Sequence, residues 1–86
     1  MSRFVIRIAP IAKKQIDGLL SDVKTRVFEV LSSVLSESPF LGKALKAELK
    51  GLYSYRVGDY RIIYNIVRHQ LIVQVLKVMH RREVYR

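Results

Sequence analysis

The segment Tyr53–Tyr64, which reads YSYRVGDYRIIY, constrains the fold more than any other part of the chain. Two runs rich in aromatic and β-branched residues, the composition of β-strands, flank the pair Gly58–Asp59. Glycine at the first central position of a two-residue loop is typical of a type II′ hairpin turn. We therefore predict an antiparallel hairpin in which Arg56 lies directly opposite Arg61.

This arginine pair also indicates a chemistry. Residues directly opposite each other on antiparallel strands share a face of the sheet, so the hairpin would hold two guanidinium groups side by side. Like charges in that position destabilise a sheet. A bound anion would offset their repulsion, so Arg56 and Arg61 form a candidate anion site.

The net charge of +9 is concentrated in the second half of the chain. Residues 1–41 carry six Lys or Arg against four Asp or Glu, whereas residues 42–86 carry ten against three. This asymmetry favours a polyanionic partner, either a nucleic acid or an acidic protein. A solvated basic surface without a partner is the alternative that charge alone leaves open.

Length and composition predict a single domain over residues 1–86. Half of the residues are hydrophobic, which is too many for a disordered chain. The chain has no cysteine, so disulfides and thiolate metal sites are excluded. We find neither a secretory leader nor a run of about 18 apolar residues, so the expected location is the cytoplasm, without membrane association.

The rest of the chain predicts a strand, two helices and then a three-strand meander. Residues 3–8 alternate in polarity as a half-buried strand does, and Pro10 suits the first turn of a helix. Apolar residues recur with helical spacing over Val23–Leu35, and the very short gap between the two helices predicts a helical hairpin. The segment Phe40–Gly51 fits either a short helix or an irregular arm.

The expected fold class is therefore α+β, in the order β-α-α-β-β-β, with the helical hairpin packed on one face of a mainly antiparallel four-stranded sheet. We expect the second strand to run antiparallel to the first. The expected strands cover residues 3–8, 53–57, 60–68 and 71–79.

The tail after the last strand should approach the arginine pair. With a two-residue turn at His69–Gln70, Val78 would lie opposite Arg61 and His80 would share its side of the sheet. A one-residue shift in register would turn the whole strand over. The tail residues that this register brings near the pair are His80, Arg81, Arg82 and Tyr85.

No conventional catalytic motif is present: the chain has only two histidines, and it lacks an HExxH motif, a glycine-rich phosphate loop and a serine elbow. His69 is interpreted as a turn residue, and His80 as either a functional or a capping residue. A cluster of arginines with one histidine and one tyrosine suits phosphodiester transfer, in which charge stabilises the phosphorane and a 2′-hydroxyl attacks in line.

Two runs, LKGLYSYRVGDYRIIYNI and VLKVMHRREVYR, resemble the RelE family of toxins within the RelE/ParE superfamily. The preceding strand and helical hairpin match the layout of that family, so the resemblance covers essentially the whole chain. It implies a metal-independent endoribonuclease that enters the ribosomal A site and cuts messenger RNA. It also implies a cognate acidic antitoxin, and no cofactor.

The resemblance further implies roles for single residues. Arg61 matches the sheet arginine that stabilises charge at the scissile phosphate, and Arg81 matches the tail arginine assigned to the leaving group or the phosphate. Tyr85 matches the tyrosine that orients a nucleotide, and Arg56 falls where relatives carry a basic lysine. The candidate catalytic set is Arg56, Arg61, His80, Arg81 and Tyr85, and the candidate RNA-binding residues are Lys43, Lys46, Lys50, Arg82 and Arg86.

Ser54 departs from the family pattern, because well-studied members have a basic residue at that position. The general base is therefore open: arginine is a poor base since its pKa exceeds about 12, which leaves His80 or Lys50. Three other functions remain: a ParE-like gyrase inhibitor, a non-catalytic nucleic-acid-binding domain, and a toxin made inactive by Ser54.

Overall fold

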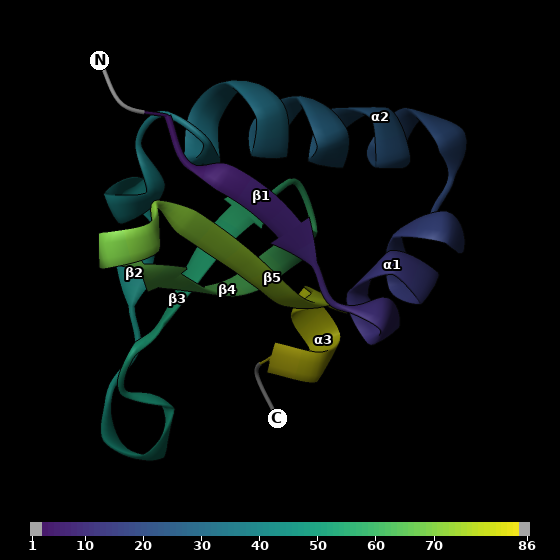
Figure 1. The fold of residues 1–86 in the computed structure, drawn as a ribbon. Coiled ribbons are helices and arrows are strands. Elements are labelled where there is room, and N and C mark those ends of the chain that lie inside the picture. The colour runs from purple at the N-terminus through teal and green to yellow at the C-terminus, as the bar shows by residue number, and fades with distance from the viewer. Residues whose placement is uncertain (1–2, 85–86) are drawn as a thin grey trace.

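A five-stranded sheet in the order β1-β5-β4-β3-β2 forms the body of the chain (Figure 1). The computed structural model describes the backbone of residues 3–84 and the side chains of residues 3–82. β1 pairs in parallel with β5, and the other neighbours are antiparallel. The strands are β1 Val5–Ile8, β2 Lys43–Ala44, β3 Leu52–Val57, β4 Tyr60–Val67 and β5 Ile72–His80.

Two helices pack on one face of this sheet, as predicted. α1 (Pro10–Asp17) has its proline in the first turn, and α2 (Ser21–Glu29) continues without a break into the π-helical segment η1 (Val30–Leu35). Figure 1 shows α2 and η1 as one long helix that runs along the sheet, with α1 at one end. The buried positions of these helices recur at helical spacing, namely Ala12, Ile16, Val27, Leu31 and Leu35.

Alternation along the strands separates a core face from an open face. The helices pack against every second residue of the central strands: Val57, Ile62, Tyr64, Val73, Val75 and Val78. Arg56 and Arg61 occupy the alternate positions and lie directly opposite each other across the hairpin. The predicted cross-strand pair on the sheet face away from the helices is therefore confirmed.

The expectation of four strands was wrong, because residues Lys43–Ala44 of the arm form the short strand β2 against β3. β2 runs antiparallel to β3. It therefore has the direction that we expected for the strand over residues 53–57, which is β3. Consequently β3 runs parallel to β1, not antiparallel as expected. Two residues are too few to show an alternation in the sequence, so only the tertiary pairing reveals this strand.

Tyr64 anchors the arm to the sheet. Its side chain is fully buried, and its hydroxyl donates a hydrogen bond of 2.6 Å to the carbonyl oxygen of Pro39. Gly42 lies directly over the tyrosine hydroxyl, where any β-carbon would collide with it. Burial raises the pKa of Tyr64 to about 12, against the opposing effect of the Gly42 backbone.

The last strand contains a β-bulge that the sequence analysis did not predict. The pairing follows the expected register from Val67 to Tyr64, where Tyr64 lies opposite Val75. The next residue, Ile63, then lies opposite Lys77, so Leu76 is the extra residue of the bulge. The register beyond Leu76 is therefore shifted by one position.

This bulge corrects the expected position of the strand end. Met79, not Val78, lies opposite Arg61, and His80 lies opposite Tyr60. His80 consequently shares the face of Tyr60 and not that of Arg61, contrary to the prediction. The polar residues Gln74 and Lys77 carried a signal for the bulge, because residues three apart cannot share one face of a regular strand.

Within residues 3–84, no helix combines the length and the apolar character that crossing a membrane would need.

Candidate active site at the hairpin turn

The Gly58–Asp59 turn is the structural centre of the site. Gly58 has a φ of 59°, which glycine adopts without strain and which a type II′ turn requires at this position. The carbonyl oxygen of Gly58 accepts a hydrogen bond of 3.0 Å from Arg56 Nε, and that of Asp59 accepts one of 2.7 Å from the Arg81 backbone N–H. Both carbonyl groups of the turn therefore hold an arginine of the candidate set.

Arg61 is oriented by the residue that departed from the family pattern. Its Nη1 donates a hydrogen bond of 3.3 Å to Ser54 Oγ, and Ser54 is only 5% exposed. The hydroxyl of Ser54 thus serves as an acceptor for a guanidinium group. We conclude that Ser54 helps to position Arg61.

Arg81 lies at the start of the short helix α3 (Arg81–Val84), beside the turn. Its Nη1 is 4.0 Å from Asp59 Oδ1, and the two side chains are 60% and 63% exposed. Such an exposed pair contributes little to stability. The backbone hydrogen bond to Asp59 and the ion pair together keep Arg81 at the same end of the sheet as Arg56 and Arg61.

His80 caps helix α3. Its Nδ1 accepts a hydrogen bond of 3.2 Å from the backbone N–H of Arg82, and its ring packs edge-on against Tyr60 with 5.1 Å between ring centroids. An acceptor Nδ1 carries no hydrogen, so the hydrogen of the neutral ring is on Nε2. A base role for His80 would therefore require the ring to give up this cap.

Two further cations belong to this region and were missed by the sequence analysis. Arg26 of α2 reaches the turn from the helix side, because a β-carbon added to Gly58 would lie 3.5 Å from its Nη1. Lys77 lies opposite Ile63 and therefore on the open face. The bulge at Leu76 hid Lys77, and no local pattern indicates the long-range approach of Arg26.

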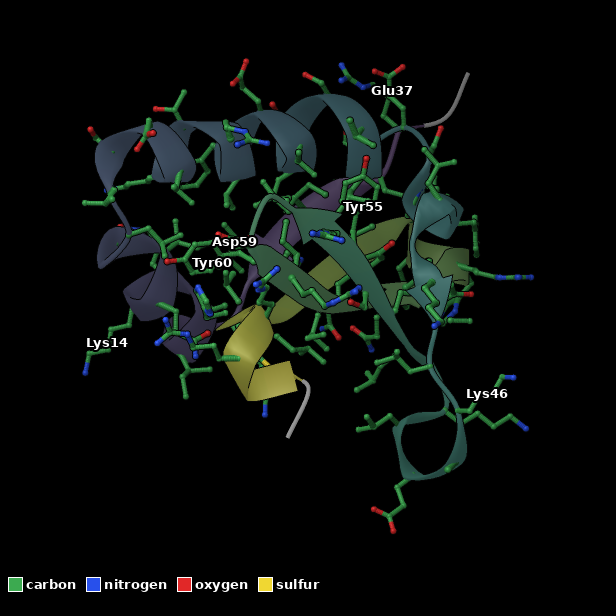
Figure 2. All side chains as sticks on the ribbon, turned by 180° about the vertical axis from the view of Figure 1, so that it is seen from behind. Lys14, Glu37, Lys46, Tyr55, Asp59 and Tyr60 are labelled. Atoms are coloured by element: carbon green, nitrogen blue, oxygen red, sulfur yellow. The ribbon has the colours of Figure 1, made fainter. Side chains whose placement is uncertain are left out.

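The predicted RNA-binding lysines divide into two groups. Lys43 lies opposite Ser54 in the sheet and so extends the basic open face to the edge strand. Lys46 and Lys50 are exposed on the arm that projects from the sheet, and Figure 2 shows Lys46 well apart from the turn of Asp59. Lys50 lies before the start of β3, and Arg56 lies near the other end of that strand, about 13 Å of strand beyond Leu52. The structure thus does not bring Lys50 to the arginines.

Of the three remaining predicted residues in the tail, only Arg82 lies within the described part of the chain. Arg82 is exposed on α3, next to Arg81. Tyr85 and Arg86 lie outside the described residues, so their predicted roles stay predictions. Among the described side chains, no group of three His, Cys, Asp or Glu residues is arranged to hold a metal ion.

Comparison with known proteins identifies the same layout. A family model described as the ParE toxin of the type II toxin–antitoxin system parDE matches residues 6–85. Toxin RelG of Mycobacterium tuberculosis (strain ATCC 25618 / H37Rv) is 33% identical over 84 residues, which cover 96% of this chain and 97% of the relative. Toxin RelE of the same strain is 30% identical, over 94% of this chain and 84% of its own.

Solved structures agree with these relatives. The toxin–antitoxin complex RelBE2 from Mycobacterium tuberculosis superimposes with a TM-score of 0.88 and 32% identity, over 93% of both chains. The archaeal RelE–RelB complex from Pyrococcus horikoshii OT3 gives a TM-score of 0.76 and 26% identity, over 92% of this chain and 96% of the other.

Proposed function

We propose that this chain, which belongs to the RelE/ParE superfamily of toxins of type II toxin–antitoxin systems, is a ribosome-dependent endoribonuclease that cuts messenger RNA. The observation that carries the proposal is the gathering of Arg56, Arg61 and Arg81 around one hairpin turn. Arginines held this close together repel one another, and a phosphate between them would remove the repulsion.

The reaction follows from the charge of the site. The 2′-oxygen of one nucleotide forms a bond to the adjacent phosphorus while the bond from phosphorus to the 5′-oxygen breaks. The products are a 2′,3′-cyclic phosphate and a 5′-hydroxyl. The phosphorane carries more negative charge than the starting diester, so Arg61 and Arg81 would stabilise the transition state more than the substrate.

Two proton transfers accompany this step: the 2′-hydroxyl loses a proton and the leaving 5′-oxygen gains one. His80 is our candidate for the base; to act there it would have to give up its cap on α3 and turn from the face of Tyr60 to that of Arg61. Arg81 is the candidate that neutralises the leaving oxygen, and Tyr85 the candidate that orients a nucleotide. No metal ion or cofactor enters the proposed mechanism.

The open face of the sheet supports a large RNA partner. Five cations lie on it by register, and their phosphate contacts would give affinity without base readout. Such a surface suits a message that the ribosome already holds in place. The five cations are Arg7, Lys43, Arg56, Arg61 and Lys77.

Primer extension on the same message with and without translating ribosomes tests the proposal. We expect new 5′ ends within the translated region only, and only when ribosomes and protein are both present. Equal cleavage of the naked message would contradict ribosome dependence. Intact message in both samples would contradict the endoribonuclease itself.

A cognate acidic antitoxin is the proposed partner of the free protein. The similar solved structures from Mycobacterium tuberculosis and Pyrococcus horikoshii are complexes of a toxin with its antitoxin. A chain with a net charge of +9 would attract an acidic partner over a long range.

Inhibition of DNA gyrase is the second candidate function, because the matching family model is described as a ParE toxin. This function would act through protein contacts and would need no phosphodiester chemistry. A supercoiling assay with purified gyrase separates the two: inhibition that survives Arg61→Ala and Arg81→Ala would favour the second candidate.

A further inference from the structure

We propose that Asp59 is a positioning residue for Arg81, a role that rests on the proposed endoribonuclease function. Asp59 contacts Arg81 twice, once with its backbone carbonyl oxygen at 2.7 Å from the Arg81 nitrogen and once with its carboxylate at 4.0 Å from Nη1. The first contact fixes the main chain at the start of α3. The second contact directs the guanidinium group.

The location of Asp59 explains why this residue suits the role. Asp59 belongs to the turn whose two flanking strands carry Arg56 and Arg61. Its contacts therefore hold Arg81 against the same hairpin as the other two arginines. Figure 2 shows Asp59 at the end of that hairpin, with the ribbon of α3 close by. A misplacement of about 1 Å is enough to reduce the rate of a catalysed step strongly.

A stabilising role is a poor explanation for the ion pair. Both side chains are more than half exposed, and exposed pairs of this kind contribute little to folding. The carboxylate also carries the wrong charge for a surface that binds RNA, since it weakens the attraction for phosphate. A negative charge at this position is therefore better explained by what it does to Arg81.

This combination predicts an unusual kinetic result for Asp59→Asn. Removal of a negative charge should leave binding to programmed ribosomes unchanged or tighter. Loss of the partner of Arg81 should lower the single-turnover cleavage rate on the order of 10- to 100-fold. A purely electrostatic role would instead raise affinity without lowering the rate, and a purely structural role would lower the melting temperature.

The experiment compares the full-length wild type with three variants. Asp59→Glu keeps the carboxylate and should retain most of the rate, whereas Asp59→Asn should lose it. Asp22→Asn, an equal charge change at an exposed position of α2, is the matched control and should leave rate and binding unchanged. Melting temperatures of the wild type and the two Asp59 variants should agree.

A second readout does not depend on activity. The ¹⁵N resonance of the Arg81 side chain should move in Asp59→Asn relative to the wild type, and it should stay in place in Asp22→Asn. An unmoved resonance would overturn the positioning role. So would a wild-type cleavage rate in Asp59→Asn, provided that the wild type cuts. A wild-type protein that cuts no ribosome-bound message would instead overturn the proposed function and the positioning role together.

Discussion

At the scale of single residues, main-chain carbonyls and a serine hydroxyl help to orient the arginines of the site. Arg56 is held by the carbonyl oxygen of Gly58, and Arg61 contacts the hydroxyl of Ser54. Acceptors of this kind orient a guanidinium group without cancelling its charge. At Arg81, by contrast, Asp59 supplies a carboxylate.

Arg61→Ala and Arg81→Ala should each remove most of the cleavage. Each change removes transition-state stabilisation of about 3–4 kcal/mol, which corresponds to a rate loss on the order of 10²–10³. The fold should remain intact, because both side chains lie outside the helix-side core. Single-turnover cleavage on translating ribosomes measures the effect. Lys14→Ala, at an exposed lysine that Figure 2 shows on α1, is the control and should cut like the wild type.

Tyr64→Phe should destabilise the protein and change its behaviour at high pH. Below pH 10 we expect a loss of about 1–3 kcal/mol in the free energy of unfolding, because the buried carbonyl of Pro39 loses its donor. The pKa of Tyr64 is raised from 10.0 to about 12, so the folded state holds the proton more tightly than the unfolded state. This stabilisation is complete below pH 10 and is lost as the pH rises toward 12.

Urea unfolding of wild type and Tyr64→Phe between pH 8 and pH 12, scanned in steps of about one unit, measures both effects. The wild type should lose stability more steeply above pH 10, so that the two curves converge. Parallel curves over the whole range would contradict the prediction. Tyr55→Phe, at a half-buried tyrosine of β3, is the matched control.

At the scale of elements, the hairpin of β3 and β4 does more than present two side chains. Its turn binds the start of α3, and its outer strand pairs with β2, which carries Lys43. The bulge at Leu76 determines which face each residue at the end of β5 occupies. The hairpin therefore connects the candidate arginines, the edge lysine and the tail helix.

Gly58→Val should damage both the fold and the site. A β-branched residue at a φ of 59° is strained, at a cost of about 1–3 kcal/mol. Relief of that strain would move the carbonyl groups that hold Arg56 and Arg81, so cleavage should fall further than the loss of stability explains. Gly58→Asn is the control, because asparagine enters positive φ more readily. Equal melting temperatures and equal rates for the two variants would refute this view of the turn.

At the scale of the whole molecule, charge is divided between the two sides of the sheet. The open face carries the five cations named above, whereas α1 and α2, which cover the other face, carry four cations against the three anions Asp17, Asp22 and Glu29. Glu37, which Figure 2 shows near the end of the long helix, follows η1 and pairs with Arg3. Positive charge is thus more concentrated on the open face, which is the face proposed to bind RNA.

The same charge should govern binding of the antitoxin. We expect the antitoxin to cover or rearrange the surface of Arg56, Arg61, Arg81 and Tyr85, so that antitoxin and RNA exclude each other. Screening beyond about 8 Å at physiological salt should make added salt slow association more than it speeds dissociation. Stopped-flow association over a range of salt measures this, with competition against programmed ribosomes. A toxin–antitoxin complex that still binds ribosomes and cuts message would rule out inhibition by coverage.

The sequence by itself determined the hairpin, its Arg56–Arg61 pair and the division of the strands into a core face and an open face. These features depend on local turn chemistry and on alternation with a period of two, which neighbouring residues encode directly. It also determined the helical hairpin, because the spacing of Ala12 to Leu35 leaves one apolar stripe to bury.

Only the tertiary structure decided the short strand β2, the bulge at Leu76 and the resulting face of His80. A two-residue strand is defined by its partner, and a bulge is defined by the register between two paired strands. The approach of Arg26 to the turn and the contact of Asp59 with Arg81 have the same origin. These last two contacts join residues more than twenty positions apart, 26 to 58 and 59 to 81, and such contacts exist only once the chain has packed.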